Sequence, residues 1–277
     1  MDPHSIDTVI YHANCSDGFG AAWSAWKLLG DRAMYVPATH GEPPPDVTGQ
    51  NVAIFDFAFD NATTKSLVKA AANLIVIDHH KSAMVELHDV ACAHFDMKHS
   101  GAMLAWNFFH PGVEAPRLIK YIEDRDLWKW ELSYSREFAA AFDMVEFKFE
   151  EYDRFVNDSV VDDAIKRGSY ILAYTRNSVS NLAKKAAHRK LMGHDIAVIN
   201  SSHWIDELGD SLGMTADAAL IWKLDHQKGT INVSLRAQHA DIDVCEIAET
   251  FGGGGHRRSA GFTLSGSSSI EDIFDRQ

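Results

Sequence analysis

The sequence predicts an α/β protein with two lobes. A doubly wound, mainly parallel sheet forms the N-terminal lobe, and a long helical linker joins it to a smaller C-terminal α/β domain. Short apolar runs alternate with helix-like segments over residues 8–80, which is typical of a parallel sheet with helices on both faces. A helical pattern without proline then runs from about residue 160 to 192, and strand and helix patterns return after it.

The N-terminal elements follow from apolar periodicity, caps and chain breakers. Runs such as TVIYHA and NLIVIDHH predict buried strands, and residues with helical spacing after Asp17 and Asn61 predict helices. The proline-rich stretch GEPPPDVTG predicts a loop. In order, we expect strands over 8–13, 33–38, 51–58 and 73–80, helices over 17–29 and 61–72, and the loop over 41–49.

The pattern turns helical after residue 80 and becomes mixed again near the C-terminus. We expect helices over 99–109, 115–124 and 135–144, then the linker helix, then strands over 194–201, 218–224, 230–237 and 259–264 with helices over 204–213 and 243–252. The predicted division is a catalytic domain over 1–165, a helical linker over 166–192 and a substrate-binding domain over 193–277.

Composition and charge restrict the function classes. A chain of 277 residues suits about two domains. A net charge of −13 argues against binding a long duplex nucleic acid, which rests on Lys and Arg neutralising many phosphates. Three widely spaced cysteines, without a CxxC pair, suit reduced thiols in a cytosol. We find neither a signal-like leader nor an apolar run of about 18 residues, so we expect a cytoplasmic protein without a membrane segment.

Residues of metal-ligand type lie at the carboxyl ends of three of the predicted strands. The first strand ends with His12, with Cys15 and Asp17 in the turn after it; the third contributes Asp56, and the fourth contributes Asp78, His79 and His80. A single Asp at a strand end is more often a turn former or a helix cap. Because the carboxyl ends of parallel strands meet at one edge, however, these side chains should converge and share a cation. Two metal ions bridged by Asp56 would activate water and bind a phosphoryl group.

Two motifs resemble the DHH phosphoesterase superfamily. The stretch IDHH (77–80) resembles the signature of that family, and FGGGGHRRSAGF (251–262) resembles the GGGH motif of its associated C-terminal domain. The resemblance covers roughly residues 5–265. It implies two lobes with the active site between them, a centre of two Mn²⁺ ions, and hydrolysis of phosphoester or phosphoanhydride bonds. Zn²⁺, Fe²⁺, Co²⁺ and Mg²⁺ are the alternative ions.

The resemblance also implies roles for individual residues. His12, Asp17, Asp56 and His79 match metal ligands, His80 matches a residue that faces the substrate phosphate, and Asp78 would hold a histidine. Cys15 stands where the family often has an aspartate, so it either replaces a hard ligand with a softer thiolate or faces away. For the last metal ligand the stretch YIEDRDLWKWEL offers Asp126, which we favour, and Asp124. The other aspartate would pair with Arg125 or cap a helix.

Further residues are candidates for substrate binding. The glycines of GGGGHRR would let the backbone approach an anion, although a flexible loop with a cationic end is the simpler interpretation. Arg236 would pair with a phosphate or take part in a surface salt bridge. The candidates are Gly254, Gly255, His256, Arg257, Arg236, His99 and Ser100.

The resemblance implies phosphodiester hydrolysis in short oligoribonucleotides or linear dinucleotides, with adenosine 3′,5′-bisphosphate as a further substrate. An exopolyphosphatase is the alternative, and a non-catalytic nucleotide-binding regulator is a third. The expected partner is therefore a short anionic phosphate compound, and a homodimer is compatible with the sequence. A nucleotide enzyme also needs an aromatic surface for a base, and the sequence does not indicate which of the seven Trp side chains supplies it.

Overall fold

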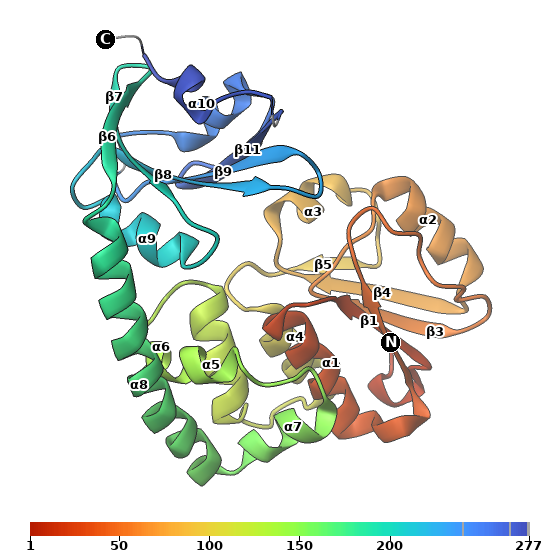
Figure 1. Cartoon of the computed structure of the whole chain (residues 1–277). Coiled ribbons are helices and arrows are strands. Elements are labelled where there is room, and N and C mark those ends of the chain that lie inside the picture. Colours follow the sequence, from red (N-terminus) through yellow and green to blue (C-terminus); the bar gives the residue numbers. More distant parts are fainter. Residues whose placement is uncertain (240, 266, 276–277) are drawn as a thin grey trace. The chain divides into compact units, whose positions relative to one another are not determined.

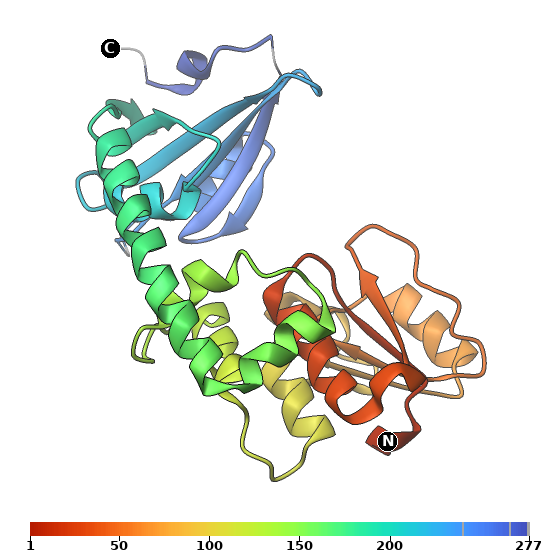
Figure 2. The ribbon, with the colours of Figure 1, turned by 60° about the horizontal axis from the view of Figure 1, so that its bottom comes forward.

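The computed structural model describes residues 1–239, 241–265 and 267–275. The chain divides into two compact units, Met1–Leu172 and Ala173–Gln277. The α8 helix (Asp158–Ala183) begins in the first unit and ends in the second, as Figure 2 shows. Among the described residues, none of the helices combines the length and the apolar composition that crossing a membrane requires.

The first unit is built on a five-stranded sheet in the order β2-β1-β3-β4-β5. All four strand pairs are parallel, as the alternation of strands and helices predicts. The strands are β1 (Thr8–His12), β2 (Met34–Ala38), β3 (Asn51–Phe55), β4 (Asn73–Asp78) and β5 (Ala93–Phe95). The helices are α1 (Ser16–Leu29), α2 (Asn61–Ala70), α3 (Lys81–Glu86), α4 (Gly101–Phe109), α5 (Arg117–Asp126), α6 (Ser135–Phe142) and α7 (Phe149–Asp153).

Helices cover both faces of this sheet, as predicted for a doubly wound fold (Figure 1). Val9 of β1 packs in one core with residues of α1 and α4. The next residue, Ile10, packs on the opposite face with Leu67 of α2. Since successive side chains of a strand point to opposite faces, a strand covered on both sides must be apolar throughout. This is why TVIY contains no alternation of apolar and charged residues.

A third core lies among the helices of the first unit. Trp23 and Trp106 stack at 5.8 Å between ring centroids within it, and both are buried. These two tryptophans therefore belong to a helical core. Val161 and Ala164, near the beginning of α8, complete this core, so the N-terminal part of α8 packs in the first unit.

The second unit contains a six-stranded mixed sheet in the order β10-β11-β9-β8-β7-β6 (Figure 2). Only β7 and β8 pair in parallel; the other described neighbours are antiparallel. The α9 helix covers one face and α10 the other. The bounds are β6 (Ala187–Leu191), β7 (His194–Asn200), α9 (Ile205–Leu212), β8 (Ala218–Asp225), β9 (Thr230–Arg236), α10 (Val244–Thr250), β10 (Gly254–His256) and β11 (Ser259–Ser265).

The sequence prediction fails at several short elements, the helix α7 among them. The helical pattern expected to reach Met192 ends at Ala183, because Ala187–Leu191 pairs with β7 as the edge strand β6. Strands β5 and β10 have only three residues each, too few for periodicity to reveal, and α3 was not predicted either.

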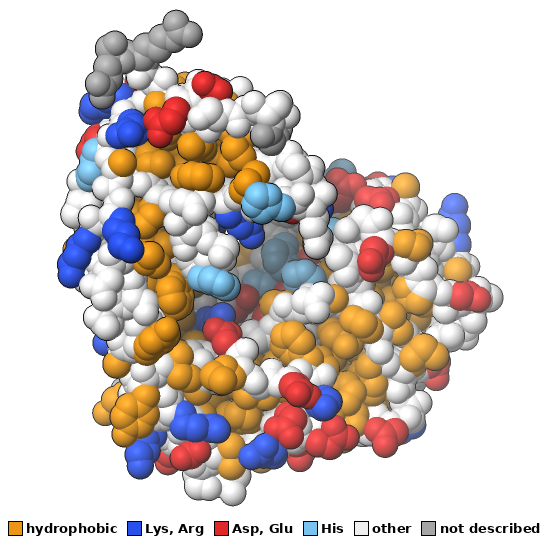
Figure 3. All heavy atoms as spheres, viewed as in Figure 1, with side chains coloured by type: hydrophobic (Ala, Val, Ile, Leu, Met, Phe, Trp, Pro, Cys, Tyr) orange, Lys and Arg blue, Asp and Glu red, His pale blue; other side chains and the backbone are white. Residues whose placement is uncertain are grey.

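On the face of the molecule seen in Figure 3, acidic side chains are mixed with basic ones.

Candidate metal centre

The carboxyl ends of three adjacent strands bring the predicted ligands to one edge of the parallel sheet. His12 is the last residue of β1, Asp56 follows β3, and Asp78 ends β4 immediately before His79. These strands are neighbours in the order β1-β3-β4. Side chains separated by more than 60 positions in the sequence therefore meet, as the strand order of an open parallel sheet allows.

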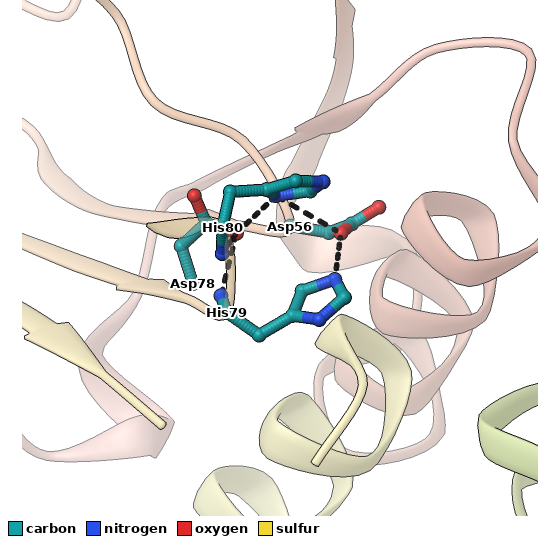
Figure 4. Close-up of side chains that lie close together, drawn as sticks. All are labelled: Asp56, Asp78, His79 and His80. Atoms are coloured by element: carbon teal, nitrogen blue, oxygen red, sulfur yellow. Dashed lines mark hydrogen bonds and ion pairs between the residues drawn. The ribbon is translucent and has the colours of Figure 1, made fainter. Parts of the chain in front are cut away.

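Three carboxylates surround the imidazole of His79. Its Nε2 atom lies 3.1 Å from Oδ1 of Asp56, 3.5 Å from Oδ2 of Asp126 and 3.6 Å from Oδ2 of Asp17. Figure 4 shows the His79 ring pointing toward the Asp56 carboxylate. Asp17 and Asp56 are almost completely buried. Buried carboxylates so close together repel one another unless a cation lies between them.

Asp17 is positioned by the N-terminus of α4. Its Oδ2 accepts a hydrogen bond of 2.6 Å from the Gly101 amide, and its Oδ1 accepts one of 2.9 Å from the Ala102 amide. The free N–H groups at a helix N-terminus stabilise a negative charge. Gly101 leaves the necessary space, because a Cβ there would lie 2.8 Å from Cγ of Asp56 and 2.9 Å from Oδ2 of Asp17. Sequence analysis missed Gly101; a glycine in the first turn of the helix predicted over 99–109 was its only signal.

Asp56 lies between two groups of potential ligands. Its Oδ2 atom is buried and finds no hydrogen-bond partner within the described part of the chain, although Nδ1 of His12 lies 3.7 Å away. Ligand atoms of His12, Cys15 and Asp56 lie within 4.8 Å of one another, and the same holds for Asp17, His79 and Asp126. An unpartnered buried oxygen among carboxylate, imidazole and thiol groups is a donor set that fits divalent metal ions.

Asp78 holds the two histidines that follow it. Its fully buried carboxylate accepts hydrogen bonds from the His79 amide at 2.7 Å and contacts Nδ1 of His80 at 2.8 Å (Figure 4). The His80 ring is about half exposed, with 48% of its side-chain surface accessible. Since Nδ1 is engaged, the ring presents its other nitrogen away from Asp78. Asp78 thus orients a histidine, which is the contact that its predicted role requires.

The charged groups shift one another's pKa values. Burial, together with the carboxylates of Asp56 and Asp126, raises the pKa of Asp17 well above its usual range. The nearby Asp56 carboxylate raises the pKa of His12 to about 10. Burial favours a higher pKa for Asp56, but its contacts with His12 and His79 outweigh burial and lower that pKa. Without a metal, protons on the imidazoles thus supply the positive charge that the carboxylates need.

The structure separates the two aspartates offered as the last ligand. Asp126, at the end of α5, turns toward His79, as described above. Asp124 turns the other way and accepts hydrogen bonds from the amides of Glu131 and Leu132 at 2.9 and 3.3 Å. Asp124 therefore closes the loop after α5, rather than pairing with Arg125 or capping a helix as expected, while Arg125 forms an ion pair with Asp143.

The two predicted substrate residues before α4 lie against α5. Glu123 contacts Nδ1 of His99 at 3.0 Å and accepts a hydrogen bond of 3.1 Å from the Ser100 amide. The Ser100 hydroxyl caps α4 by accepting a hydrogen bond of 3.4 Å from the Met103 amide. Both residues thus stiffen the helix whose N-terminus holds Asp17. Sequence analysis did not single out Glu123.

The predicted substrate residues of the second unit have well-defined structural contacts. Arg236, at the end of β9, donates a hydrogen bond of 2.8 Å from Nε to Asp206, which is the salt bridge weighed as its simpler role. The glycine motif forms strand β10, which includes Gly254, Gly255 and His256. A Cβ at Gly255 would lie 2.6 Å from Cα of Ala260, so this glycine allows close strand pairing, whereas Gly254 faces open space. Arg257 follows in the turn between β10 and β11.

Comparisons with known proteins find a family match within the second unit and relatives that align with most of the chain. Residues 179–276 match the DHHA1 domain family. The chain is 29% identical over 286 aligned positions to uncharacterized protein R106 of Acanthamoeba polyphaga mimivirus, a match that covers 94% of this chain and 68% of that protein. It is 24% identical to oligoribonuclease NrnB of Bacillus subtilis, over 72% of this chain and 54% of NrnB, so the match spans about half of that relative.

Two solved structures share the fold. The pGpG-specific phosphodiesterase PggH of Vibrio cholerae superposes with a TM-score of 0.58 at 11% identity, covering 96% of this chain and 94% of PggH. RecJ of Thermus thermophilus in complex with Mn²⁺ gives a TM-score of 0.56 at 13% identity, covering 95% of this chain and 50% of RecJ. The strand-end cluster described above lies on a fold that these proteins share.

Proposed function

We propose that the chain is a phosphoesterase of the DHH superfamily and that it hydrolyses phosphodiester bonds in short oligoribonucleotides or linear dinucleotides with the help of two divalent metal ions. The observation that carries the proposal is the buried, unpartnered Oδ2 of Asp56 between two groups of ligand-type side chains. A carboxylate in this position is suited to bridge two ions. The match to a DHHA1 domain supports a substrate-binding role for the second unit.

His12, Asp17, Asp56, His79 and Asp126 would hold the metal ions, with Cys15 beside His12. When bound, such ions lower the pKa of a coordinated water and polarise a phosphoryl oxygen. Manganese is the ion we expect, and the Mn²⁺ complex of RecJ, which shares this fold, supports that choice. Cys15 introduces a softer donor, which favours Zn²⁺, Fe²⁺ or Co²⁺ at its own position.

His80 is suited to face the substrate phosphate. The hydrogen bond to Asp78 raises the pKa of His80, so its ring carries a positive charge over a wider pH range. The ring is exposed at its outer side and fixed at Nδ1. A fixed cationic donor stabilises the negative charge that develops on a phosphoryl group, and it needs no reorientation during the reaction.

The short length of the substrate is supported by charge and by the relatives. The net charge of −13, from 39 acidic against 26 basic residues, disfavours binding of a long polyanion. NrnB is named an oligoribonuclease and PggH a pGpG-specific phosphodiesterase. Polyphosphate remains the alternative substrate, adenosine 3′,5′-bisphosphate a further one, and a non-catalytic nucleotide-binding role the third interpretation.

The test is a hydrolysis assay with Mn²⁺ on a 5′-labelled RNA dinucleotide and on polyphosphate. The variant Asp56→Asn keeps the shape of the side chain and removes its charge. Asp163→Asn, on the exposed surface of α8, is the matched control. We expect wild type and Asp163→Asn to cleave the dinucleotide and Asp56→Asn to be inactive. Cleavage of polyphosphate alone would favour the alternative, and full activity of a folded Asp56→Asn would overturn the metal assignment.

A further inference from the structure

A cavity of about 510 Å³ lies next to the candidate metal centre, entirely within the first unit. Cys15 and Asp126 line it, and each belongs to a different one of the two potential ligand groups. A group attached to a phosphate at the metal centre would therefore extend directly into this cavity. The volume is within the range of about 300–1,000 Å³ that is usual for small-molecule sites.

We infer that this cavity binds the nucleobase and ribose next to the phosphate that is held at the metal centre. The inference deepens the proposed function and rests on it for the position of the phosphate. It assigns base recognition to the N-terminal unit, through Trp128 and Phe147, and not only to the predicted substrate-binding domain.

Trp128 presents an exposed indole ring to the cavity. Its exposed fraction is 56%, which is unusual for so large an apolar side chain. Trp130 supports it from the side, with ring centroids 5.1 Å apart in a T-shaped arrangement. The guanidinium of Arg136 lies 4.4 Å from the centroid of the Trp130 ring. This arrangement supports the indole from one side and leaves the rest of the ring accessible, and an accessible aromatic ring is what base stacking requires.

Phe147 is a second exposed aromatic side chain of the same cavity, with 45% of its surface accessible. Beneath it lie Phe142 and Tyr152, which are buried and pack at 4.8 Å in a T-shaped arrangement. The ring centroids of Phe147 and Tyr152 are 6.4 Å apart. The floor of the cavity is therefore aromatic and rigid, while two exposed rings remain available to a ligand.

Polar groups accompany the aromatic rings. The ion pair between Arg125 and Asp143 lines the cavity, as do the side chains of Asn14 and Ser16. A nucleoside has hydrogen-bonding edges and ribose hydroxyls that such groups can recognise, whereas a purely apolar ligand would leave them unpaired. The lining therefore favours a nucleoside over an aliphatic chain.

Two lining residues have an unusual backbone conformation. Trp128 has a φ of 54° and Asn14 a φ of 55°. Asparagine tolerates this left-handed region, but for a bulky residue such as tryptophan it costs energy. The conformation of Trp128 is compatible with ligand binding, and its place in the cavity lining is what distinguishes it from Tyr134, which has a similar φ.

The test compares two ligands that differ only in the base, adenosine 5′-monophosphate and ribose 5-phosphate, binding to the Mn²⁺-loaded protein in calorimetry. We expect wild type to bind the nucleotide at least about fivefold more tightly, as stacking on aromatic rings implies. Trp128→Asn suits the left-handed backbone while removing the ring, and Phe147→Leu keeps an apolar side chain. Both variants should lose this preference and leave binding of ribose 5-phosphate unchanged. Trp128→Phe should restore much of it.

The matched control is Tyr134→Asn. Tyr134 is another exposed aromatic residue of the first unit with a φ of 63°, and it does not line the cavity. It should behave as wild type. Equal affinity of wild type for both ligands, or an unchanged preference in Trp128→Asn, would overturn the assignment. Because binding needs no turnover, this result is independent of whether the dinucleotide is hydrolysed.

Discussion

Gly101 and Asp56 are so close that no side chain fits between them. A Cβ added to Gly101 would lie 2.8 Å from the carboxyl carbon of Asp56. At the same time the Gly101 amide donates the hydrogen bond of 2.6 Å to Asp17. One glycine therefore sets both the position of the central carboxylate and the hydrogen bonding of its neighbour.

Gly101→Ala should damage the metal centre more than the fold. The added methyl group must displace Asp56 or Asp17, and overpacking of this kind costs about 1–3 kcal/mol of stability. We expect weaker Mn²⁺ binding in calorimetry and a large loss of hydrolysis, with a moderate decrease in Tm. Gly254→Ala is a control for stability, because a Cβ there meets no atom within 4 Å. Normal Mn²⁺ affinity in Gly101→Ala would contradict the geometry.

Asp78→Asn should change the pH profile of activity as well as its level. The asparagine oxygen can still accept the His79 amide, but the negative charge that raises the pKa of His80 is lost. The pKa of His80 should fall, so the loss of activity on the basic side of the pH profile should begin at a lower pH than in wild type. Loss of such an outer partner costs roughly 10- to 100-fold in activity or metal affinity.

The control for this change is Asp96→Asn. Asp96 follows the neighbouring strand β5, and its carboxylate accepts a hydrogen bond from the Lys98 amide. It should keep both the rate and the profile. If Asp78→Asn lost activity without a shift of the basic limb, a purely structural role for Asp78 would be the better explanation.

Sequence reasoning reached the residues that come directly after strong strand patterns. His12, Asp56 and His79 follow buried apolar runs, and the parallel order of those strands forces them together. Sequence reasoning did not separate Asp124 from Asp126, whereas the structure places only the Asp126 carboxylate beside His79. The direction of a side chain on the last turn of a helix depends on the loop that follows it, here through the amides of Glu131 and Leu132.

The remaining features depend on contacts between distant segments. Gly101 matters only because α4 begins beside β3, and Trp128 lines a cavity only because the segment before α7 returns to the same place. Neither relation leaves a periodic signal in the chain. Strand β6 was hidden for another reason: its sequence AHRKL mixes charged and apolar residues at the edge of a sheet and continues a helical pattern.

The metal-free protein should lose thermal stability as the pH rises. The pKa of His12 is raised to about 10 in the folded state, above its ordinary value of 6.5. Its stabilising contribution is therefore complete below about pH 6.5 and disappears as the pH rises through about 10. The raised pKa values of His79 and His80 act in the same direction. In EDTA, Tm measured from pH 6 to pH 10 should fall, and His12→Gln should flatten the curve.

Protein loaded with Mn²⁺ is the reference for this measurement. Metal ligands bind in their deprotonated forms, so a bound ion replaces the protons that stabilise the apo-protein at lower pH. The decrease in Tm should then be smaller than in EDTA. A decrease in His12→Gln as steep as that of wild type would show that the histidine does not contribute it.

Cys15 should make the two halves of the metal centre unequal. Its sulfur lies in the group with His12 and Asp56, whereas Asp17, His79 and Asp126 offer only oxygen and nitrogen. Thiolate is a softer ligand than carboxylate, so the first group favours Zn²⁺, Fe²⁺ or Co²⁺ and the second accepts Mn²⁺ or Mg²⁺. Cobalt-loaded wild type should show a charge-transfer absorption from thiolate to Co²⁺. Cys15→Asp should lose this absorption and gain affinity for Mn²⁺.

The other two free cysteines, Cys92 and Cys245, provide the matched controls. Cys92→Ser and Cys245→Ser should keep the cobalt absorption, because neither belongs to a ligand group with His12. If wild type showed no such absorption while Co²⁺ was bound, Cys15 would face away from the metal. In that case its position would be filled by solvent, and Cys15→Asp would increase the number of protein ligands without replacing one.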